Sequence, residues 1–461
     1  MRIGVGLPRG TSDTGLPGMT NLLKADSWLG LKPDGRVAER IASDWRWDEA
    51  RTTLRLKLRP NVYFHDGTLI TPEVAAETLR ASLAKSAYSF KSVRDITGEG
   101  ADTVTIALKE RNAFILPDLA GMLVTKPGAP DVGTGPFRVV EASGTAAKLA
   151  AFPKYYRGRP ALAGIDLNSY PTQRNAWTAL MQDKIDMLYE VSRDAADFVE
   201  AESTVKTYTF FRPYYIPLVF NVRTPALKDP RVRQAINMAI DRATLVRDGM
   251  SGRGSIADGP IPPQHWAYSP PPVPFPFSPA EAQRLLDEAH YPTRPTARTP
   301  VPVRFSFSCL VFANDSRYER LEVLVQKQLA EVGIEMRLEP VPFEEFIKRV
   351  GRGDFDAFLF ELAGRNFGWV YEFWHSVPKT RFDTGYRAAD GALDRLKGAF
   401  TDDETKAAVA DLQRVLHDDP PAAFLVWQEQ TRAVSIKFDV ATEDKRDPLT
   451  NLWQWRPAEA K

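Results

Sequence analysis

Apolar residues in the stretch 303–361 change from a two-residue period to a helical period and back, and the change occurs twice. An alternating strand begins at Val303, and a helix ends at Gly333. The apolar residues on one face of that helix are Leu321, Leu324, Val325 and Leu329. A second strand starts at Ile334, a second amphipathic helix follows, and residues 355–360 form an apolar strand. This βαβαβ order predicts parallel strands with crossover helices, and therefore a doubly wound sheet.

A second α/β unit precedes this one. Residues 165–170 and 184–189 have the pattern of strands. The segment between them carries apolar residues at helical spacing, namely Trp177, Leu180 and Met181. We therefore expect two α/β lobes. Between residues 45 and 108 the order changes to strand, turn, helix and strand, with the turn at Asp66-Gly67, which predicts an inserted α+β subdomain.

Length and composition limit the class of protein. A chain of 461 residues exceeds the size of one hydrophobic core, so about two or three lobes are expected. Hydrophobic residues make up 43% and charged residues 26%, which argues against disorder and against a membrane-embedded body. The 60 Lys and Arg residues are balanced by 59 acidic residues, giving a net charge of +1. No bulk attraction to nucleic acid or to an anionic membrane is therefore encoded.

Targeting signals are few. No run of about 18 apolar residues occurs, so no transmembrane helix is predicted. Residues 1–8 have the pattern of a first strand without an apolar leader, so we expect either a cytoplasmic chain or one whose leader was removed. Cys309 is the one cysteine, which makes an internal disulfide impossible.

Four segments carry the clearest motifs. They are residues 35–45 with 53–59, residues 62–68 (Val-Tyr-Phe-His-Asp-Gly-Thr) with 71–74 (Thr-Pro-Glu-Val), residues 133–137 (Gly-Thr-Gly-Pro-Phe), and residues 220–222 with 229–242 (beginning Asp-Pro-Arg-Val-Arg). In content, order and spacing they resemble the extracellular solute-binding proteins of family 5, which serve peptide and nickel ABC importers. With the lobes between them, the segments cover nearly the whole chain.

The resemblance implies an α/β fold: a two-lobed periplasmic-binding-protein fold with doubly wound sheets and an inserted α+β subdomain. It also implies the domain boundaries. Lobe I would comprise residues 1–30, 131–221 and 429–461, subdomain II residues 31–130, and lobe III residues 222–428. A ligand would be enclosed between the lobes when they close about hinges near residues 220–224 and 426–430.

The resemblance implies a function as well. The chain is expected to be the substrate-binding component of an ABC importer, which captures a peptide-like or other small polar solute and passes it to a membrane permease. It would act as a monomer at the periplasmic or extracellular face of the membrane, without a cofactor and without nucleic acid. Two alternatives are the ligand-sensing module of a regulator and a hydrolase with a carboxylate pair in the cleft.

The motifs also have a purely structural interpretation. Asp66-Gly67 suits a turn, whereas Thr71 and Asp229 suit helix N-caps because each is followed by a proline. We therefore predict scaffold roles for His65, Asp66 and Asp229.

Enzyme signatures are absent from the sequence. It contains no phosphate-binding loop, no H-E-x-x-H helix and no G-x-S-x-G elbow. The histidines are dispersed without metal-ligand spacing: His65, His265, His290, His375 and His417. Cys309 lies in an apolar strand, where an inert buried thiol is expected. We therefore predict no catalytic residue, no metal site and no cofactor.

The candidate binding residues lie in three places. Residues 361–375 follow the last strand of the βαβαβ run, and doubly wound sheets bind ligands beyond the carboxyl ends of their strands. Prolines concentrated between residues 257 and 279 predict an extended surface loop, whose aromatic residues are further candidates. The ligand-binding candidates are Arg365, Asn366, Phe367, Trp369 and Tyr371 of the first segment, Trp266 and Tyr268 of the loop, and Tyr214 ahead of the strand 218–222. The alternative role of the aromatic residues is packing in a core or at a hinge.

Arg365 departs from the pattern of the peptide-binding relatives. Those proteins place an aspartate after the strand that residues 355–360 resemble, where it pairs with the amino terminus of the peptide. Arginine repels an ammonium group, whereas its fork of donors suits a carboxylate or phosphate. The resemblance therefore predicts a ligand with an anionic or hydrogen-bond-accepting group near Arg365, with Trp369 and Tyr371 beside it. The alternative is an ion pair between Arg365 and Glu361 or Glu372.

Overall fold

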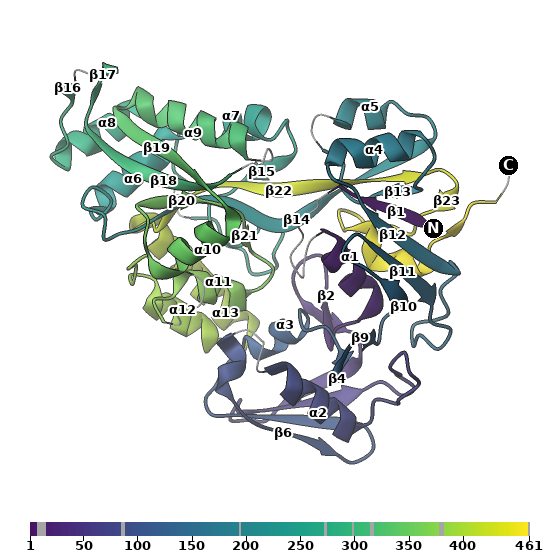
Figure 1. Ribbon diagram of the computed structural model, residues 1–461. Coiled ribbons are helices and arrows are strands. Elements are labelled where there is room, and N and C mark those ends of the chain that lie inside the picture. The colour runs from purple at the N-terminus through teal and green to yellow at the C-terminus, as the bar shows by residue number, and fades with distance from the viewer. Residues whose placement is uncertain are drawn as a thin grey trace. The chain divides into compact units, whose positions relative to one another are not determined.

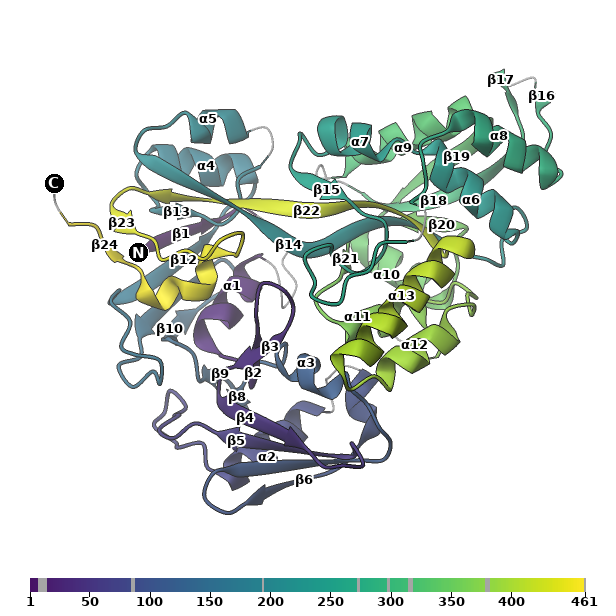
Figure 2. The same cartoon turned by 180° about the vertical axis from the view of Figure 1, so that it is seen from behind.

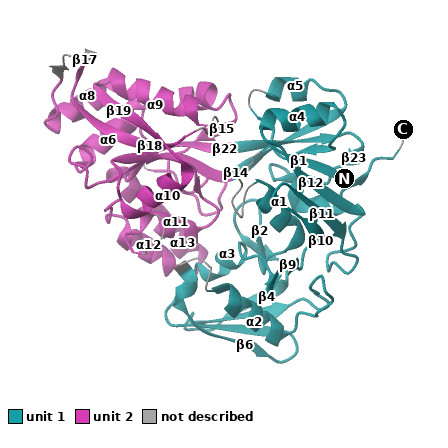
Figure 3. Ribbon diagram, viewed as in Figure 1, with its two compact units in different colours: residues 1–212, 429–461 teal, residues 213–428 magenta. Residues whose placement is uncertain are grey.

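The computed structural model divides into two compact units (Figure 1; Figure 3). It describes residues 1–6, 15–83, 88–192, 195–271, 274–296, 299–313, 318–377 and 382–459. Unit 1 consists of residues 1–212 and 429–461, and unit 2 of residues 213–428. The chain passes between the units inside the strands β14 (Val205–Phe220) and β22 (Ala422–Ser435). The three-domain boundaries and the hinges stay predictions.

The main sheet of unit 1 is built around the first strand of the chain. Its elements are β1 (Arg2–Val5), α1 (Gly15–Lys24), β10 (Phe137–Ala142), β11 (Ala146–Ala151), β12 (Gly164–Ser169), α4 (Gln173–Met181), β13 (Met187–Leu188) and α5 (Ala196–Glu200). β1 lies between β12 and β13 and is parallel to both, while β10 and β11 extend the sheet in antiparallel pairing. The predicted βαβ unit is confirmed. Its second strand is shorter than the predicted 184–189, and residues 7 and 8 of the predicted first strand lie outside the described residues.

A separate antiparallel sheet lies within unit 1. It is formed by β4 (Ala42–Trp47), β5 (Thr53–Leu58), β6 (Val93–Glu99) and β7 (Thr103–Leu108), with α2 (Pro72–Leu83) and the short helix η1 (Tyr88–Ser92). The strand order is β4-β5-β7-β6. Alternate residues of β5 are buried in a core of their own with the apolar face of α2. Strand, turn, helix and strand therefore follow one another as the sequence predicts.

Unit 2 contains the predicted βαβαβ run. Its elements are β18 (Phe305–Phe312), α9 (Glu319–Glu331), β19 (Ile334–Val341), α10 (Phe343–Arg352) and β20 (Ala357–Leu359). β18 pairs in parallel with both β19 and β20, and β14 pairs with β20 in antiparallel orientation. In both views α9 and α10 lie on opposite faces of this sheet (Figure 1; Figure 2). The doubly wound α/β arrangement is therefore confirmed for this unit.

Further helices cover the faces of the unit 2 sheet. They are α6 (Pro230–Ala239), α7 (Arg242–Thr244), the π-helical turn η3 (Leu245–Gly249), α8 (Pro279–Glu288), α11 (Phe367–Trp374), α12 (Asp390–Lys397) and α13 (Asp402–Asp418). The remaining elements of the unit are β15 (Gly254–Ile256), β16 (Arg294–Thr296), β17 (Thr299–Val303) and β21 (Leu362–Ala363). α6, α8 and α9 contribute to one continuous core with the sheet. α12 packs against α13 (Figure 2).

Unit 1 is completed by short elements. They are β2 (Leu29–Leu31), β3 (Val37–Glu39), α3 (Ile115–Leu119), β8 (Thr125–Lys126), β9 (Ala129–Gly133), β23 (Phe438–Asp439), η4 (Pro448–Gln454) and β24 (Arg456–Pro457).

The proline-rich segment differs from the predicted extended surface loop. Its described residues contain no helix or strand before α8, which confirms a loop, but turns interrupt it at Pro262 and His265. Ile261 and Ala267 are fully buried. The reason is close packing, since a Cβ atom at Gly259 would meet the Gln413 side chain at 2.2 Å. Pro272 lies outside the described residues.

Candidate functional site

The pairing of β14 with β21 brings two of the predicted residues together. Tyr214 lies opposite Ala363, and the N–H of Gly364 donates to the carbonyl of Pro213 at 2.9 Å. Arg365 follows directly, donates from its guanidinium to the Tyr214 hydroxyl and lies 5.0 Å from the centre of the Tyr214 ring. Both side chains are partly exposed. A charged group is thus held in place on a surface of unit 2.

The alternative partners of Arg365 are engaged elsewhere. The Glu361 carboxylate accepts hydrogen bonds from the Tyr318 hydroxyl at 2.6 Å and from the Gln428 amide at 2.9 Å. Among the described residues, the polar contact of the Arg365 side chain is with Tyr214 and not with Glu361 or Glu372. A neutral phenol orients the guanidinium without cancelling its charge.

Asn366 has a structural task. It is the N-cap of α11, and its side-chain oxygen accepts a hydrogen bond from the N–H of Trp369 at 3.2 Å. The residue is buried. Asn366 therefore sets where α11 begins, immediately after Arg365, rather than presenting its amide to solvent.

The aromatic residues of α11 divide between two environments. Tyr371 is buried, donates to Asp394 at 3.1 Å and stacks on His375 with 4.4 Å between ring centres. Its side chain therefore packs towards α12. Phe367 and Trp369 are partly exposed, and Trp369 contacts Phe373 at 5.6 Å. Of the three aromatic candidates on α11, Phe367 and Trp369 remain accessible.

The proline-rich segment meets α11 through an aromatic contact. The His265 ring lies 4.7 Å from the Phe367 ring and 5.8 Å from the Trp266 ring. The structure therefore places Trp266 close to the beginning of α11. Tyr268 instead donates to the carboxylate of Asp258 at 2.5 Å.

Asp258 was not predicted, because Asp-Gly-Pro is an ordinary turn sequence and gives no signal of a buried acid. Burial raises the pKa of the Asp258 carboxyl above its ordinary value. Burial and the bond to Asp258 also raise the pKa of the Tyr268 hydroxyl. The pair is a half-buried acid beside a protonated phenol.

Gly364 is required by close packing beneath the candidate residues. A Cβ atom there would lie 2.5 Å from the fully buried ring of Trp427. The same core contains Tyr215, whose hydroxyl accepts a hydrogen bond from the Trp374 indole at 3.0 Å. The segment that carries Arg365 is therefore anchored on both sides.

Metal ligands do not gather in the described part of the chain, where no three His, Cys, Asp or Glu side chains are placed to hold an ion. The absence of a metal and of a cofactor stays a prediction.

Comparison with known proteins identifies the family. The family model described as "Bacterial extracellular solute-binding proteins, family 5 Middle" matches residues 36–381. The chain belongs to this family. Its predicted function as the solute-binding component of an ABC importer is thereby confirmed, and the family consists of binding proteins.

Individual relatives agree with this assignment. The oligopeptide-binding protein AppA of Bacillus subtilis is 25% identical over 87% of this chain and 80% of its own length. The glutathione-binding protein GsiB of Pectobacterium atrosepticum is 26% identical over 67% of this chain and 62% of its own length. The structure of NikZ from Campylobacter jejuni, in complex with Ni(L-His), matches 99% of both chains with a TM-score of 0.83 at 17% identity. The two-lobed fold of family 5 is therefore confirmed.

No helix among the described residues of this family 5 protein is both long enough and apolar enough to cross a membrane.

His65 connects two of the motifs by which the sequence resembles family 5, residues 62–68 and residues 133–137. His65 Nδ1 accepts from the N–H of Gly133 at 3.3 Å, so Nε2 carries the proton that it shares with the carbonyl of Gly135 at 3.0 Å. Burial lowers the pKa of His65 and keeps the ring neutral. A Cβ atom at Gly135 would lie 2.6 Å from the carbonyl oxygen of Leu23, which explains the glycine.

The predicted turn and caps are confirmed. Gly67 has φ +89°, and the carboxylate of Asp66 accepts from the N–H of Thr68 at 3.0 Å. Lys126 and the bond from Thr68 lower the pKa of Asp66 to about 2. Thr71 caps α2, and Asp229 caps α6 by accepting from the N–H of Arg231 at 2.9 Å.

Proposed function

We propose that this family 5 protein captures a small solute through an anionic or hydrogen-bond-accepting group that binds Arg365. The observation that supports the proposal is the pairing of Arg365 with Tyr214. The guanidinium is oriented by a neutral hydroxyl and an aromatic ring, and it stays partly exposed. Its charge and remaining donors therefore suit a carboxylate or phosphate of the ligand.

The neighbouring candidates would take different parts in this site. Phe367, Trp369 and Trp266 are partly exposed and would supply apolar contact area. Asn366 and Tyr371 would act indirectly, because the first caps α11 and the second packs the helix against α12. Tyr268 would contribute together with Asp258.

The names of the relatives suggest the chemical class of the solute. Oligopeptides and glutathione, the ligands named for AppA and GsiB, are both peptide-like and both carry carboxylates. Arg365 would attract a carboxylate and repel a free ammonium group at the same place. We therefore infer a peptide-like or other small polar solute that presents an acidic or accepting end to Arg365.

We further propose that the protein binds the solute without changing it and transfers it to a permease at the periplasmic or extracellular face of the membrane. It would do so as a monomer and without a cofactor. Its division into lobes at residues 221/222 and 428/429, with residues 31–130 as a separate domain, belongs to the same proposal.

The proposal is tested by identifying the bound solute and then removing the cation. Native mass spectrometry would identify the solute that copurifies. Calorimetry would compare that solute, unmodified di- and tripeptides, and their N-acetylated and carboxyl-amidated forms. Arg365→Ala should weaken binding of the solute about tenfold or more, because a charge-assisted bond is lost. The matched control is Arg247→Ala, an exposed arginine of unit 2 paired with Asp248.

Several outcomes would count against the proposal. Equally tight binding of di- and tripeptides whose carboxyl terminus is amidated and whose side chains are not acidic would remove the preference for an anionic group. An unchanged affinity of Arg365→Ala for the copurified solute would remove Arg365 from the site. Recovery of a chemically altered solute after incubation would favour the hydrolase.

A further inference from the structure

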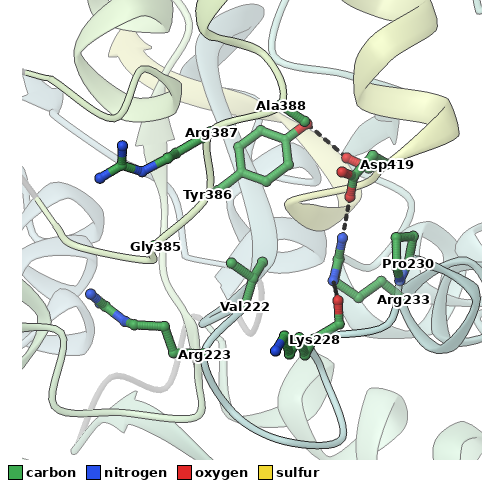
Figure 4. Close-up of a pocket in the computed structure, with 10 residues that line it drawn as sticks. All are labelled: Val222, Arg223, Lys228, Pro230, Arg233, Gly385, Tyr386, Arg387, Ala388 and Asp419. Atoms are coloured by element: carbon green, nitrogen blue, oxygen red, sulfur yellow. Dashed lines mark hydrogen bonds and ion pairs between the residues drawn. The ribbon is translucent and has the colours of Figure 1, made fainter.

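A hollow in unit 2 has more cationic than anionic side chains in its lining. It has a volume of about 430 Å³. The lining residues are Val222, Arg223, Lys228, Pro230, Arg233, Gly385, Tyr386, Arg387, Ala388 and Asp419 (Figure 4). Four of them are basic and one is acidic. None of them belongs to the candidate solute site.

Arg233 and Asp419 form the wall of this hollow. Arg233 is 2% exposed and donates to the carbonyls of Leu227, Lys228 and Pro420 as well as to the Asp419 carboxylate. Its charge is balanced by Asp419, and its donors are used within the protein. Figure 4 shows this side chain directed at Asp419. Arg233 therefore shapes the hollow and does not supply a binding charge.

Arg223 is held rigidly at the same hollow. Its Nε donates to Asn221 at 3.2 Å, and its Nη2 lies 3.2 Å from the carboxylate of Asp383. The aliphatic part of the Arg223 side chain packs against Gly385, where an added Cβ atom would lie 3.0 Å from Arg223 Cγ. Half of the side chain stays exposed, at 50%. Nη2 also donates to the Asp383 carbonyl, so among the described residues Nη1 is the nitrogen of Arg223 that keeps its donors, and Asp383 offsets part of the charge.

Lys228 and Arg387 supply the excess charge. Both are exposed, and within the described residues neither side chain has a hydrogen-bonding or ion-pairing partner. In Figure 4 the side chains of Arg223 and Arg387 extend in the same direction, away from Arg233. After the pairs Arg233–Asp419 and Arg223–Asp383 are set aside, two positive charges remain at the hollow.

We propose that this hollow, which we name the basic pocket, binds a phosphate-type oxyanion with two or more negative charges. Two uncompensated cations match the charge of such a ligand, and Nη1 of Arg223, held in place by the bonds of Nε and Nη2, can donate to one of its oxygens. The same chemistry is present in free phosphate or pyrophosphate and in the headgroup of an anionic phospholipid. The proposal does not depend on Arg365, because the basic pocket shares no residue with that site.

The test uses inorganic pyrophosphate as the probe and the full-length protein. Calorimetry at an ionic strength of about 0.01 M would minimise screening, and repetition at about 0.15 M would measure it. The double variant Lys228→Gln/Arg387→Gln should bind pyrophosphate about tenfold or more weakly. Arg247→Gln is the matched control, since it removes a paired, exposed arginine of the same unit. Circular dichroism would show that all variants are folded.

A second arm distinguishes the two sources of phosphate. Cosedimentation with vesicles of phosphatidylglycerol would be compared with vesicles of phosphatidylcholine. Pyrophosphate binding that the double variant loses supports a free oxyanion, whereas vesicle binding alone, lost in the same variant, supports a headgroup. Absence of both, or equal binding by the double variant and the wild type, would overturn the proposal. Binding of the copurified solute should be unchanged in the double variant, which separates this test from that of Arg365.

Discussion

Arg365 and Tyr214 make two contacts with each other across 151 residues of sequence. The guanidinium donates to the hydroxyl and also lies over the ring, with 5.0 Å between Arg365 Cζ and the ring centre. A cation over an aromatic face is attracted by the ring electrons, and the hydrogen bond fixes its direction. Tyr214 therefore positions the charge that we propose for solute recognition.

Removing the Tyr214 hydroxyl should weaken solute binding moderately. In Tyr214→Phe the ring remains under Arg365, but the hydrogen bond that orients the guanidinium is lost. We expect affinity for the copurified solute to fall about two- to tenfold, equivalent to roughly 0.5–1.5 kcal/mol. Tyr214→Ala also removes the ring and should bind more weakly still. Calorimetry measures both, and equal affinities for the wild type and the two variants would contradict the positioning role.

Loss of the α11 cap should destabilise unit 2. In Asn366→Ala the N–H of Trp369 loses its acceptor, and the first turn of α11 loses the bond that starts it. We expect the free energy of unfolding to fall by about 0.5–2 kcal/mol. Urea unfolding followed by circular dichroism measures the change.

Asn366→Asp and Asn366→Ser are the controls for this prediction, because each keeps a side-chain oxygen at the N-cap. Both should retain most of the stability that Asn366→Ala loses. If all three substitutions had the same cost, the cap bond would not be its cause.

The neutral ring of His65 should make stability depend on pH. Burial lowers the pKa of His65 in the folded protein, so the unfolded chain binds a proton more readily below about pH 6.5. The stabilisation is therefore complete above about pH 6.5 and is lost as the pH falls towards the folded pKa. Protonation would also turn Nδ1 into a donor that faces the N–H of Gly133.

The measurement compares urea unfolding of the wild type and of His65→Gln from about pH 7.5 to about pH 5. Glutamine does not titrate, so the wild type should lose more stability than the variant over this range. Parallel pH profiles for the two proteins would show that His65 does not cause the dependence.

The sequence predicts best where the determinants are local. The change of period in residues 303–361 predicts β18, α9, β19, α10 and β20, because the spacing of apolar residues shows which segments are strands and which are helices. A glycine also follows each helix, at Gly333 and Gly353, and marks its end. The N-caps Asp229 and Thr71 were predictable for the same reason, because a capping hydrogen bond joins residues only about two or three positions apart.

Features that depend on distant pairing were not predictable. The partner of Arg365 follows from the register of β14 on β21, which no local pattern contains, so the carboxylates Glu361 and Glu372 were the obvious alternatives. The proline-rich segment was expected at the surface because of its composition. It is partly buried because Gly259 allows close packing against Gln413. The basic pocket likewise combines Lys228 with Arg387, which no local pattern places together.

The last prediction concerns Arg233, a buried arginine on α6. Its contribution to the free energy of unfolding can be compared with that of Arg231, an exposed arginine on the same helix. Arg233→Met keeps apolar volume but leaves the Asp419 carboxylate and the carbonyls of Leu227 and Pro420 without their donor. Because the Asp419 side chain is 34% exposed and water can solvate its carboxylate, the main cost comes from the buried carbonyls, and the free energy of unfolding should fall by about 1–3 kcal/mol. Arg231→Met is the matched control, since Arg231 is 47% exposed and water screens its pair with Asp229, so its loss should change stability little. Urea unfolding of both variants measures the two losses of stability, and similar losses for Arg231→Met and Arg233→Met would show that burial of the arginine does not determine the loss.

Asp419→Asn separates the effect of charge from that of hydrogen bonding, because the amide oxygen can still accept from Arg233 while the compensating negative charge is gone.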